Sequence, residues 1–232
     1  MQQKFMQTNS HAHDSGAMSG NLSKKKRLEN LEIPKPSAAE VDKYIRKWND
    51  DLSLKHYVIE EKIVVDLFQT YPKNTCEEEV LVKVKTLNLF YNTGIINTTA
   101  VTKNILEIKD VDELLRQPND DIIEKIANVT ISGKSMRFYS FATKYCHHHH
   151  PTQYPIYDSF VSKALVHFNK QDPFYTFKEI DIRKYSTFEN VILEFSKKYH
   201  LEKYRFRELD LYLWLLGKEK FPIKINDKTK KI

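Results

Sequence analysis

The chain has 232 residues, of which 41% are hydrophobic and 12% aromatic, enough to bury the core of one domain. Its 5 glycines and the lack of a Gly-rich phosphate loop argue against a β-sandwich, a Rossmann fold or a P-loop enzyme. The 37 lysines and arginines exceed the 31 acidic residues and give a net charge of +6, which favours a polyanionic partner such as nucleic acid.

Residues 1–36 are polar, carry the basic run KKKR at 24–27 and end in a Pro-Lys-Pro sequence. This composition is typical of a disordered basic arm. Ser37 is a good N-cap for a first helix, so we expect the folded domain to span residues 37–232.

Apolar residues recur at helical spacing along the rest of the chain and predict eight to ten short helices. Valines at 80, 82 and 84 would also suit a strand, but the longer helical stripe over 77–91 decides against it. The predicted helices lie at about 37–49, 56–70, 77–91, 98–107, 110–116, 119–127, 133–146, 158–168, 186–199 and 204–216. The sequence therefore predicts an all-α, compact multi-helix domain, with an apolar last helix that is buried.

The two cysteines, Cys76 and Cys146, form no CxxC pattern, so a reducing compartment is expected. No apolar run approaches the length of a membrane span, and the N-terminus has no apolar signal core. We expect a soluble, cytoplasmic monomer with no membrane contact and no obligate protein partner.

Polar and charged residues gather in one segment, residues 122–158, which is predicted to run helix, short turn, helix and a Pro-containing loop that ends in Asp158. The turn, NVTISGK at 128–134, resembles the hairpin of the helix-hairpin-helix DNA glycosylase superfamily, Leu-Pro-Gly-hydrophobic-Gly-x-Lys. In this resemblance Thr130 and Ser132 stand at the two glycine positions, and Lys134 stands at the lysine that bifunctional members use. The segment PIYD at 155–158 is similar to the approach to the catalytic aspartate of that family.

The sequence also departs from the family pattern. Both hairpin glycines are missing, although Gly133 is adjacent, and serine and threonine disfavour the left-handed backbone that glycine allows. The loop before Asp158 is longer than is usual and begins with four histidines at 147–150.

The resemblance implies an enzyme that flips a base out of DNA and cleaves its N-glycosidic bond, with lyase activity in addition if Lys134 is a nucleophile. Asp158 is then the catalytic carboxylate, which stabilises positive charge on the sugar or activates water, and Lys134 is either a Schiff-base nucleophile or a phosphate contact. Asp158 would otherwise be an ordinary helix N-cap, and Asp210 is the alternative acid. The hairpin residues expected to hold the DNA backbone are Thr130, Ser132, Gly133 and Ser135.

The histidine run offers metal-ligand chemistry, but no second Cys/His cluster completes a tetrahedral site, so no metal is predicted. We expect the loop histidines, His148 among them, either to contact DNA or to lie on the surface. Asn92, Tyr139 and Tyr157 are candidates for a base pocket, with helix caps and core aromatics as the alternative.

The sequence thus predicts a DNA glycosylase acting on double-stranded DNA without a cofactor or an iron–sulfur cluster. Oxidised, alkylated and phage-type modified bases all remain open as substrates. The alternatives are a non-catalytic helix-hairpin-helix DNA-binding module and a helical protein-interaction domain.

Overall fold

The computed structural model describes residues 33–221, nearly all of which belong to the second of two units into which the chain divides, Met1–Pro34 and Lys35–Ile232. The predicted basic arm at 1–36 lies almost wholly outside the described residues, as does the end of the chain from 222 to 232.

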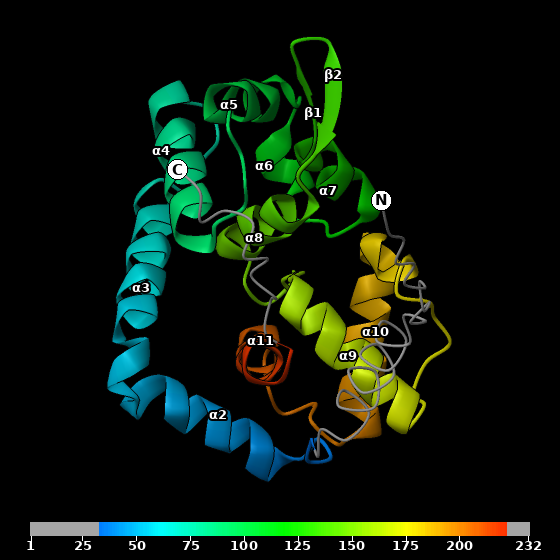
Figure 1. Cartoon of the computed structure of the whole chain (residues 1–232). Helices are drawn as coiled ribbons and strands as arrows, with labels where there is room; N and C mark the ends of the chain where they lie inside the picture. The colour runs from blue at the N-terminus through cyan, green and yellow to red at the C-terminus, as the bar shows by residue number, and fades with distance from the viewer. Residues whose placement is uncertain (1–32, 222–232) are drawn as a thin grey trace, which may run out of the picture. The chain divides into compact units, whose positions relative to one another are not determined.

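The described residues form ten α-helices, two short 3-10 helices and one β-hairpin (Figure 1). The α-helices are α2 (Ala38–Asp50), α3 (Lys55–Thr70), α4 (Glu77–Tyr91), α5 (Thr98–Glu107), α6 (Val111–Leu114), α7 (Asp120–Ala127), α8 (Tyr139–His149), α9 (Ser159–Gln171), α10 (Tyr185–Lys198) and α11 (Phe206–Lys220). The 3-10 helices are η1 (Leu52–Leu54) and η2 (Asp181–Arg183), and the hairpin strands are β1 (Asn128–Ile131) and β2 (Lys134–Arg137). The predicted all-α class is confirmed.

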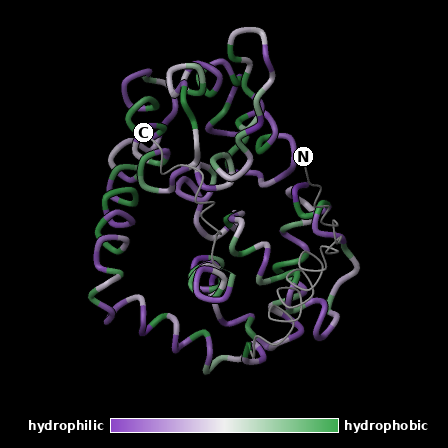
Figure 2. The backbone as a smooth tube through the Cα atoms, viewed as in Figure 1, coloured by the Kyte–Doolittle hydropathy of each residue, from purple (hydrophilic) through white to green (hydrophobic). Residues whose placement is uncertain are grey.

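Several helix ends follow from local sequence. The Ser37 hydroxyl accepts the backbone N–H of Glu40 and caps α2, as predicted. Three consecutive glutamates open α4, where the positive end of the helix dipole favours negative charge. Figure 2 shows hydrophobic and hydrophilic residues interleaved along the helices, the pattern of helices that bury one face.

The last helix, α11, packs against both α9 and α2 and carries the buried leucines 209, 211, 213, 215 and 216. Its contact with α9 is close at one point, because a Cβ built on Gly217 would lie 2.5 Å from the Phe160 carbonyl oxygen. Glycine is therefore required for this approach, which fixes α11 beside the start of α9. The predicted burial of the last helix is confirmed.

The structure does not show the predicted helix-hairpin-helix element. Instead, β1 pairs with β2 in antiparallel register, with Ile131 opposite Lys134, and α8 begins only at Tyr139 rather than near 133. Ser132 and Gly133 form the two-residue turn with φ of 50° and 76°, the left-handed backbone that such hairpin turns need. A Val-Thr-Ile run before the turn suits a strand, and this local preference prevails here.

Candidate functional site

Lys144 and Asp158 meet where α8 faces the start of α9. The Lys144 side chain is buried, and its Nζ lies 3.6 Å from Asp158 Oδ2. The ammonium also donates to Ser140 Oγ at 2.7 Å and to the Tyr157 carbonyl oxygen at 3.2 Å. A cation is thus held next to a carboxylate by groups from one helix and from the loop that follows it.

Asp158 has two tasks in this arrangement. It is the N-cap of α9, the alternative role that the sequence left open, because Oδ1 accepts the backbone N–H of Phe160 at 2.8 Å. Its other oxygen, Oδ2, is the one that faces Lys144. The capping role and the catalytic role expected for Asp158 are therefore compatible, since each uses a different oxygen.

Hydrogen bonds hold the loop between α8 and α9 in the position that brings Asp158 next to Lys144. The Tyr157 backbone N–H donates to Thr143 Oγ1 at 3.1 Å, and the buried Tyr154 hydroxyl donates to the Leu115 carbonyl oxygen at 2.9 Å. Ser140 and Lys144 lie one turn apart on α8, so both reach the Tyr157 carbonyl oxygen. The loop therefore presents Asp158 to Lys144 in one defined position.

The pair lines a cavity of about 470 Å³ formed by α2, α3, α4, α8, α9 and α11. Its aromatic wall comes from three helices: Trp48 lies edge-on to Trp214 at 6.3 Å between ring centroids, and Tyr57 lies edge-on to the same ring at 5.3 Å. A volume of this size suits a small planar ligand, and aromatic rings offer it stacking surfaces.

Cations cover these rings from within the protein. The Arg207 guanidinium lies 5.2 Å from the Trp48 ring centroid, and the Lys218 ammonium lies 4.1 Å from that of Tyr57 and 4.8 Å from that of Trp214. Lys218 also donates to the Tyr57 hydroxyl at 2.5 Å. These contacts hold the aromatic wall in place.

A second carboxylate, Asp210 on α11, lines the same cavity. Its Oδ2 accepts from Arg207 Nη1 at 3.1 Å, and Arg207 also forms an ion pair with Glu61. Burial raises the pKa of Asp210 to about 7, against the opposing charges of Arg207 and Lys144. This is the residue that the sequence indicated as the alternative acid.

Burial lowers the pKa of Lys144 below the usual range of a lysine, although Asp158 and Asp210 both oppose the shift. A lower pKa increases the share of neutral amine near neutral pH, and the neutral amine is the nucleophilic form. The arrangement can therefore attack an electrophilic carbon placed in the cavity.

The predicted nucleophile Lys134 and the predicted backbone clamp lie elsewhere. Lys134, Thr130, Ser132, Gly133 and Ser135 are all exposed on the β-hairpin, which projects from the helices in Figure 1, and none of them lines the cavity. The structure thus separates Lys134 from Asp158 and places Lys144 there instead. The shift follows from the hairpin, because α8 starts later than predicted and presents a different lysine.

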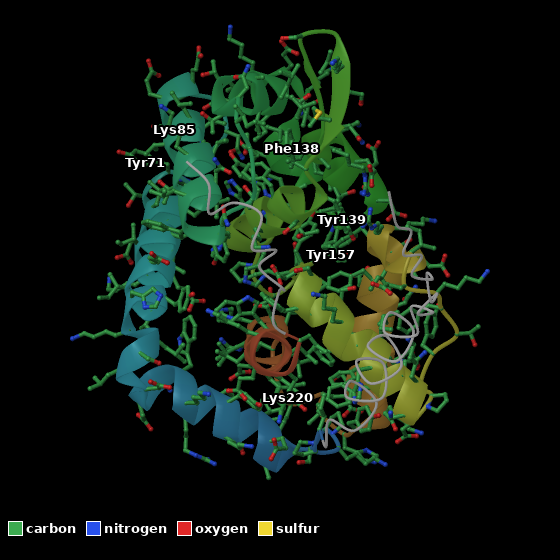
Figure 3. The ribbon with its side chains drawn as sticks, viewed as in Figure 1. Tyr71, Lys85, Phe138, Tyr139, Tyr157 and Lys220 are labelled. Carbon is green, nitrogen blue, oxygen red and sulfur yellow. The ribbon has the colours of Figure 1, made fainter. Side chains whose placement is uncertain are left out.

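Of the three predicted base-pocket residues, only Asn92 lines the cavity; it ends α4 in a left-handed conformation, with φ of 47°. The ring centroids of Tyr139 and Tyr157 are 4.7 Å apart, and neither residue lines the cavity. The two tyrosines are labelled next to each other in Figure 3. Tyr139 donates to the Ile182 carbonyl oxygen, and the Tyr157 ring meets Phe188 edge-on. Tyr139 is therefore a core aromatic, and Tyr157 is a partly buried ring packed against the core.

The histidine run is not a surface loop. Residues 147–149 form the last turn of α8, and His148 is buried with its Nε2 2.9 Å from the Tyr91 hydroxyl, so the prediction that His148 contacts DNA is wrong. Burial lowers the pKa of all four histidines, to about 4 for His147, so the buried ones are neutral at neutral pH. Among residues 33–221 no group of three His, Cys, Asp or Glu side chains is placed to hold a metal ion.

Lys144 is the site residue that the sequence analysis missed. A signal was present, since this lysine stands in the stretch FATKYC, where Phe141, Ala142, Tyr145 and Cys146 are all buried. A lysine inside an apolar stretch of helix is rarely buried without a specific reason. Trp48 and Tyr57 gave no such signal, because they join the cavity only through helix packing.

None of the helices in the described part of the chain is long and apolar enough to cross a membrane.

Comparison with known proteins places the chain in a family. The HI_0787_N family model, described as an N-terminal domain, matches residues 40–153, a range that contains Lys144 but ends before Asp158. An uncharacterized protein of Haemophilus influenzae is 45% identical over 149 residues, which cover 64% of this chain and 71% of that protein. The chain therefore belongs to the HI_0787_N family. No solved structure matches it.

Proposed function

We propose that this protein is a DNA glycosylase that excises a modified base, with Lys144 as the amine nucleophile and Asp158 as its partner carboxylate. The observation that carries the proposal is the buried Lys144 ammonium, 3.6 Å from Asp158 Oδ2, at the wall of an aromatic cavity. The substrate class is taken from the sequence resemblance of residues 128–158 to the helix-hairpin-helix glycosylases, in which Lys134, not Lys144, stands at the family's lysine.

The chemistry follows from the two groups. The neutral Lys144 amine attacks C1′ of the flipped nucleotide, the C1′–N bond breaks, and its electron pair leaves with the base. Asp158 stabilises the positive charge that grows on the sugar and accepts the proton that the lysine nitrogen loses after attack. The nitrogen lone pair then expels O4′ from C1′, and O4′ takes the proton held by Asp158, so the sugar ring opens and a protonated imine with Lys144 forms, the intermediate from which the proposed lyase reaction starts.

The cavity supports this choice of substrate. A base in a duplex is out of reach of a buried amine, so the nucleotide must turn out of the stack and enter a pocket. Trp48, Tyr57 and Trp214 provide aromatic surfaces against which an extruded base can pack. Asn92, at the end of α4, offers an amide that can hydrogen-bond to the edge of a base.

The β-hairpin gives the enzyme a contact for the duplex. A two-stranded β-ribbon fits the major groove, and hydroxyl and lysine side chains bind phosphate oxygens without reading sequence. Thr130 and Ser135 are paired across the hairpin, and Lys134 follows the turn; all three are exposed. We propose that these residues hold the DNA backbone, in a β-hairpin rather than in a helix-hairpin-helix turn.

The test is incubation with duplexes that carry single oxidised, alkylated or phage-type modified bases, scored for abasic sites and strand cleavage. Sodium borohydride should trap a covalent adduct with the wild-type protein and none with Lys144→Gln. Asp158→Asn should keep duplex binding and lose excision. Lys134→Gln is the matched control, and it should still give the adduct.

Two outcomes would contradict the proposal. Duplex binding without excision from any member of the panel would indicate a non-catalytic DNA-binding protein. An adduct that persists in Lys144→Gln but disappears in Lys134→Gln would return the nucleophile to the hairpin.

A further inference from the structure

Asp210 is a buried carboxylate that the proposed attack on C1′ does not use. It projects from α11 into the cavity that holds Lys144 and Asp158. One of its oxygens, Oδ2, is held by Arg207 at 3.1 Å, whereas the other, Oδ1, is buried and has no hydrogen-bond partner in the described structure. A buried polar atom without a partner is costly, so a ligand group at Oδ1 would have a clear role.

Charged groups from three other elements surround Asp210. Arg207 lies one turn before it on α11 and is shared with Glu61 of α3. Lys144 of α8 favours the ionised form of Asp210, whereas the negative charges of Asp158 and Glu61 oppose it. Desolvation outweighs the two cations and raises the pKa of Asp210 to about 7, so a large fraction of Asp210 is protonated at neutral pH.

The two carboxylates of the cavity therefore have different environments. Asp158 accepts a backbone N–H and has Lys144 Nζ at 3.6 Å from its other oxygen. Asp210 is more deeply buried, with a side chain 13% exposed against 22% for Asp158, and one of its oxygens is unpaired. Two carboxyl groups with such different surroundings in one site are the arrangement that separate acid and base roles need.

We propose that Asp210 is the general acid of the reaction and protonates the base as it leaves. This role rests on the proposed glycosylase activity. When the Lys144 nitrogen bonds to C1′, the C1′–N electron pair moves onto the departing base, and the carboxylic acid proton of Asp210 passes to that base. Asp210 is left as a carboxylate paired with Arg207 and takes a new proton from water after the base departs.

The experiment measures single-turnover excision for a series of analogues of the excised base that carry fluoro or nitro substituents, which make the base a better leaving group. A poor leaving group needs the proton most. Asp210→Asn should slow excision of the parent base about 10²-fold and slow the best leaving group much less. Asp50→Asn, at an exposed carboxylate at the end of α2, is the matched control and should change neither rate.

The pH dependence gives a second measurement that does not depend on a folded variant. The ratio of the wild-type rate for the parent base to that for the best leaving group should fall as pH rises through about 7, because Asp210 loses the proton it donates, whereas the titration of Lys144 changes both rates alike. In Asp210→Asn this fall should disappear.

The outcomes separate the two proposals. Suppose that the wild-type protein excises the base. If Asp210→Asn then slows good and poor leaving groups equally, or if the wild-type pH profile is the same for both, the role of Asp210 alone is wrong. Absence of excision by the wild-type protein overturns the proposed function and this role with it.

Discussion

Lys83 and Lys144 are both lysines buried in the interior, and burial lowers the pKa of each, to about 8 for Lys83. Their surroundings differ. The Lys83 ammonium donates to three neutral oxygens, those of the Tyr71 and Lys73 carbonyls and Asn74 Oδ1, at 3.0, 2.8 and 2.7 Å. Lys144 has a carboxylate as one neighbour and a cavity beside it.

The two lysines differ in what lies beside them and not in burial. Lys83 ties the loop between α3 and α4 to α4, Asn74 continues the connection to Asp112 at 2.7 Å, and Lys83 does not line the cavity. The Lys144 ammonium also has three acceptors, but one of them is a carboxylate, and Lys144 lines the cavity. We therefore propose a structural role for Lys83 and a chemical role for Lys144.

The largest expected effect is on catalysis. Lys144→Gln should lower the single-turnover excision rate at least about 10³-fold, because loss of a nucleophile removes the covalent route. Lys83→Gln should leave the rate of the folded protein within a few-fold of wild type. Rapid-quench kinetics on the preferred duplex measures both. Equal losses of excision rate in the two variants would contradict the different roles proposed for Lys83 and Lys144.

The free energy of unfolding should fall more in the Lys83 variant than in the Lys144 variant. Lys83→Ala removes a donor from the Tyr71 and Lys73 carbonyl oxygens and one of the two donors of Asn74 Oδ1, and we expect it to lower the free energy of unfolding by about 3 kcal/mol. Lys144→Gln should cost less, because its amide can still donate a hydrogen bond and a desolvated charge is removed. Urea unfolding followed by circular dichroism provides the values. A larger loss for Lys144→Gln would show that Lys144 is the structural lysine.

The pH dependence of stability sharpens the assignment of Lys83. Its pKa is about 8 in the folded protein and 10.5 as the reference value, so the unfolded chain binds more protons between these pH values. The contribution of Lys83 to stability should therefore rise from pH 8 to 10.5, by up to about 3 kcal/mol. The measurement is the difference in unfolding free energy between wild type and Lys83→Met across this range. A constant difference would contradict the lowered pKa.

The smallest expected effect concerns the exposed lysine of the hairpin. Lys134→Ala should weaken duplex binding only a few-fold and reduce the salt slope of the binding constant by about 1, since it removes one phosphate contact. Fluorescence anisotropy at several salt concentrations measures both quantities. An unchanged salt slope would show that Lys134 makes no phosphate contact. It would not change the roles proposed for Lys144 and Lys83.

The sequence by itself determined the helices, because their apolar spacing and caps are local properties of the chain. Ser37 caps α2 as expected, the leucine-rich last helix is buried, and α9 begins after Asp158, where the sequence placed a helix start. Fewer residues of the candidate site could be predicted from the sequence. Asp158, Asp210 and Asn92 were identified as candidates, but the lysine beside them was taken to be Lys134.

Only the tertiary structure decided which residues meet. The hairpin at 128–137 was missed because four-residue strands carry too weak a periodic signal to oppose a helical prediction, and that error moved the predicted lysine by ten positions. Trp48, Tyr57 and Trp214 come from three helices, and no local pattern relates them before α2, α3 and α11 pack. Helix formation depends on near neighbours in the sequence, whereas a cavity depends on contacts between distant segments.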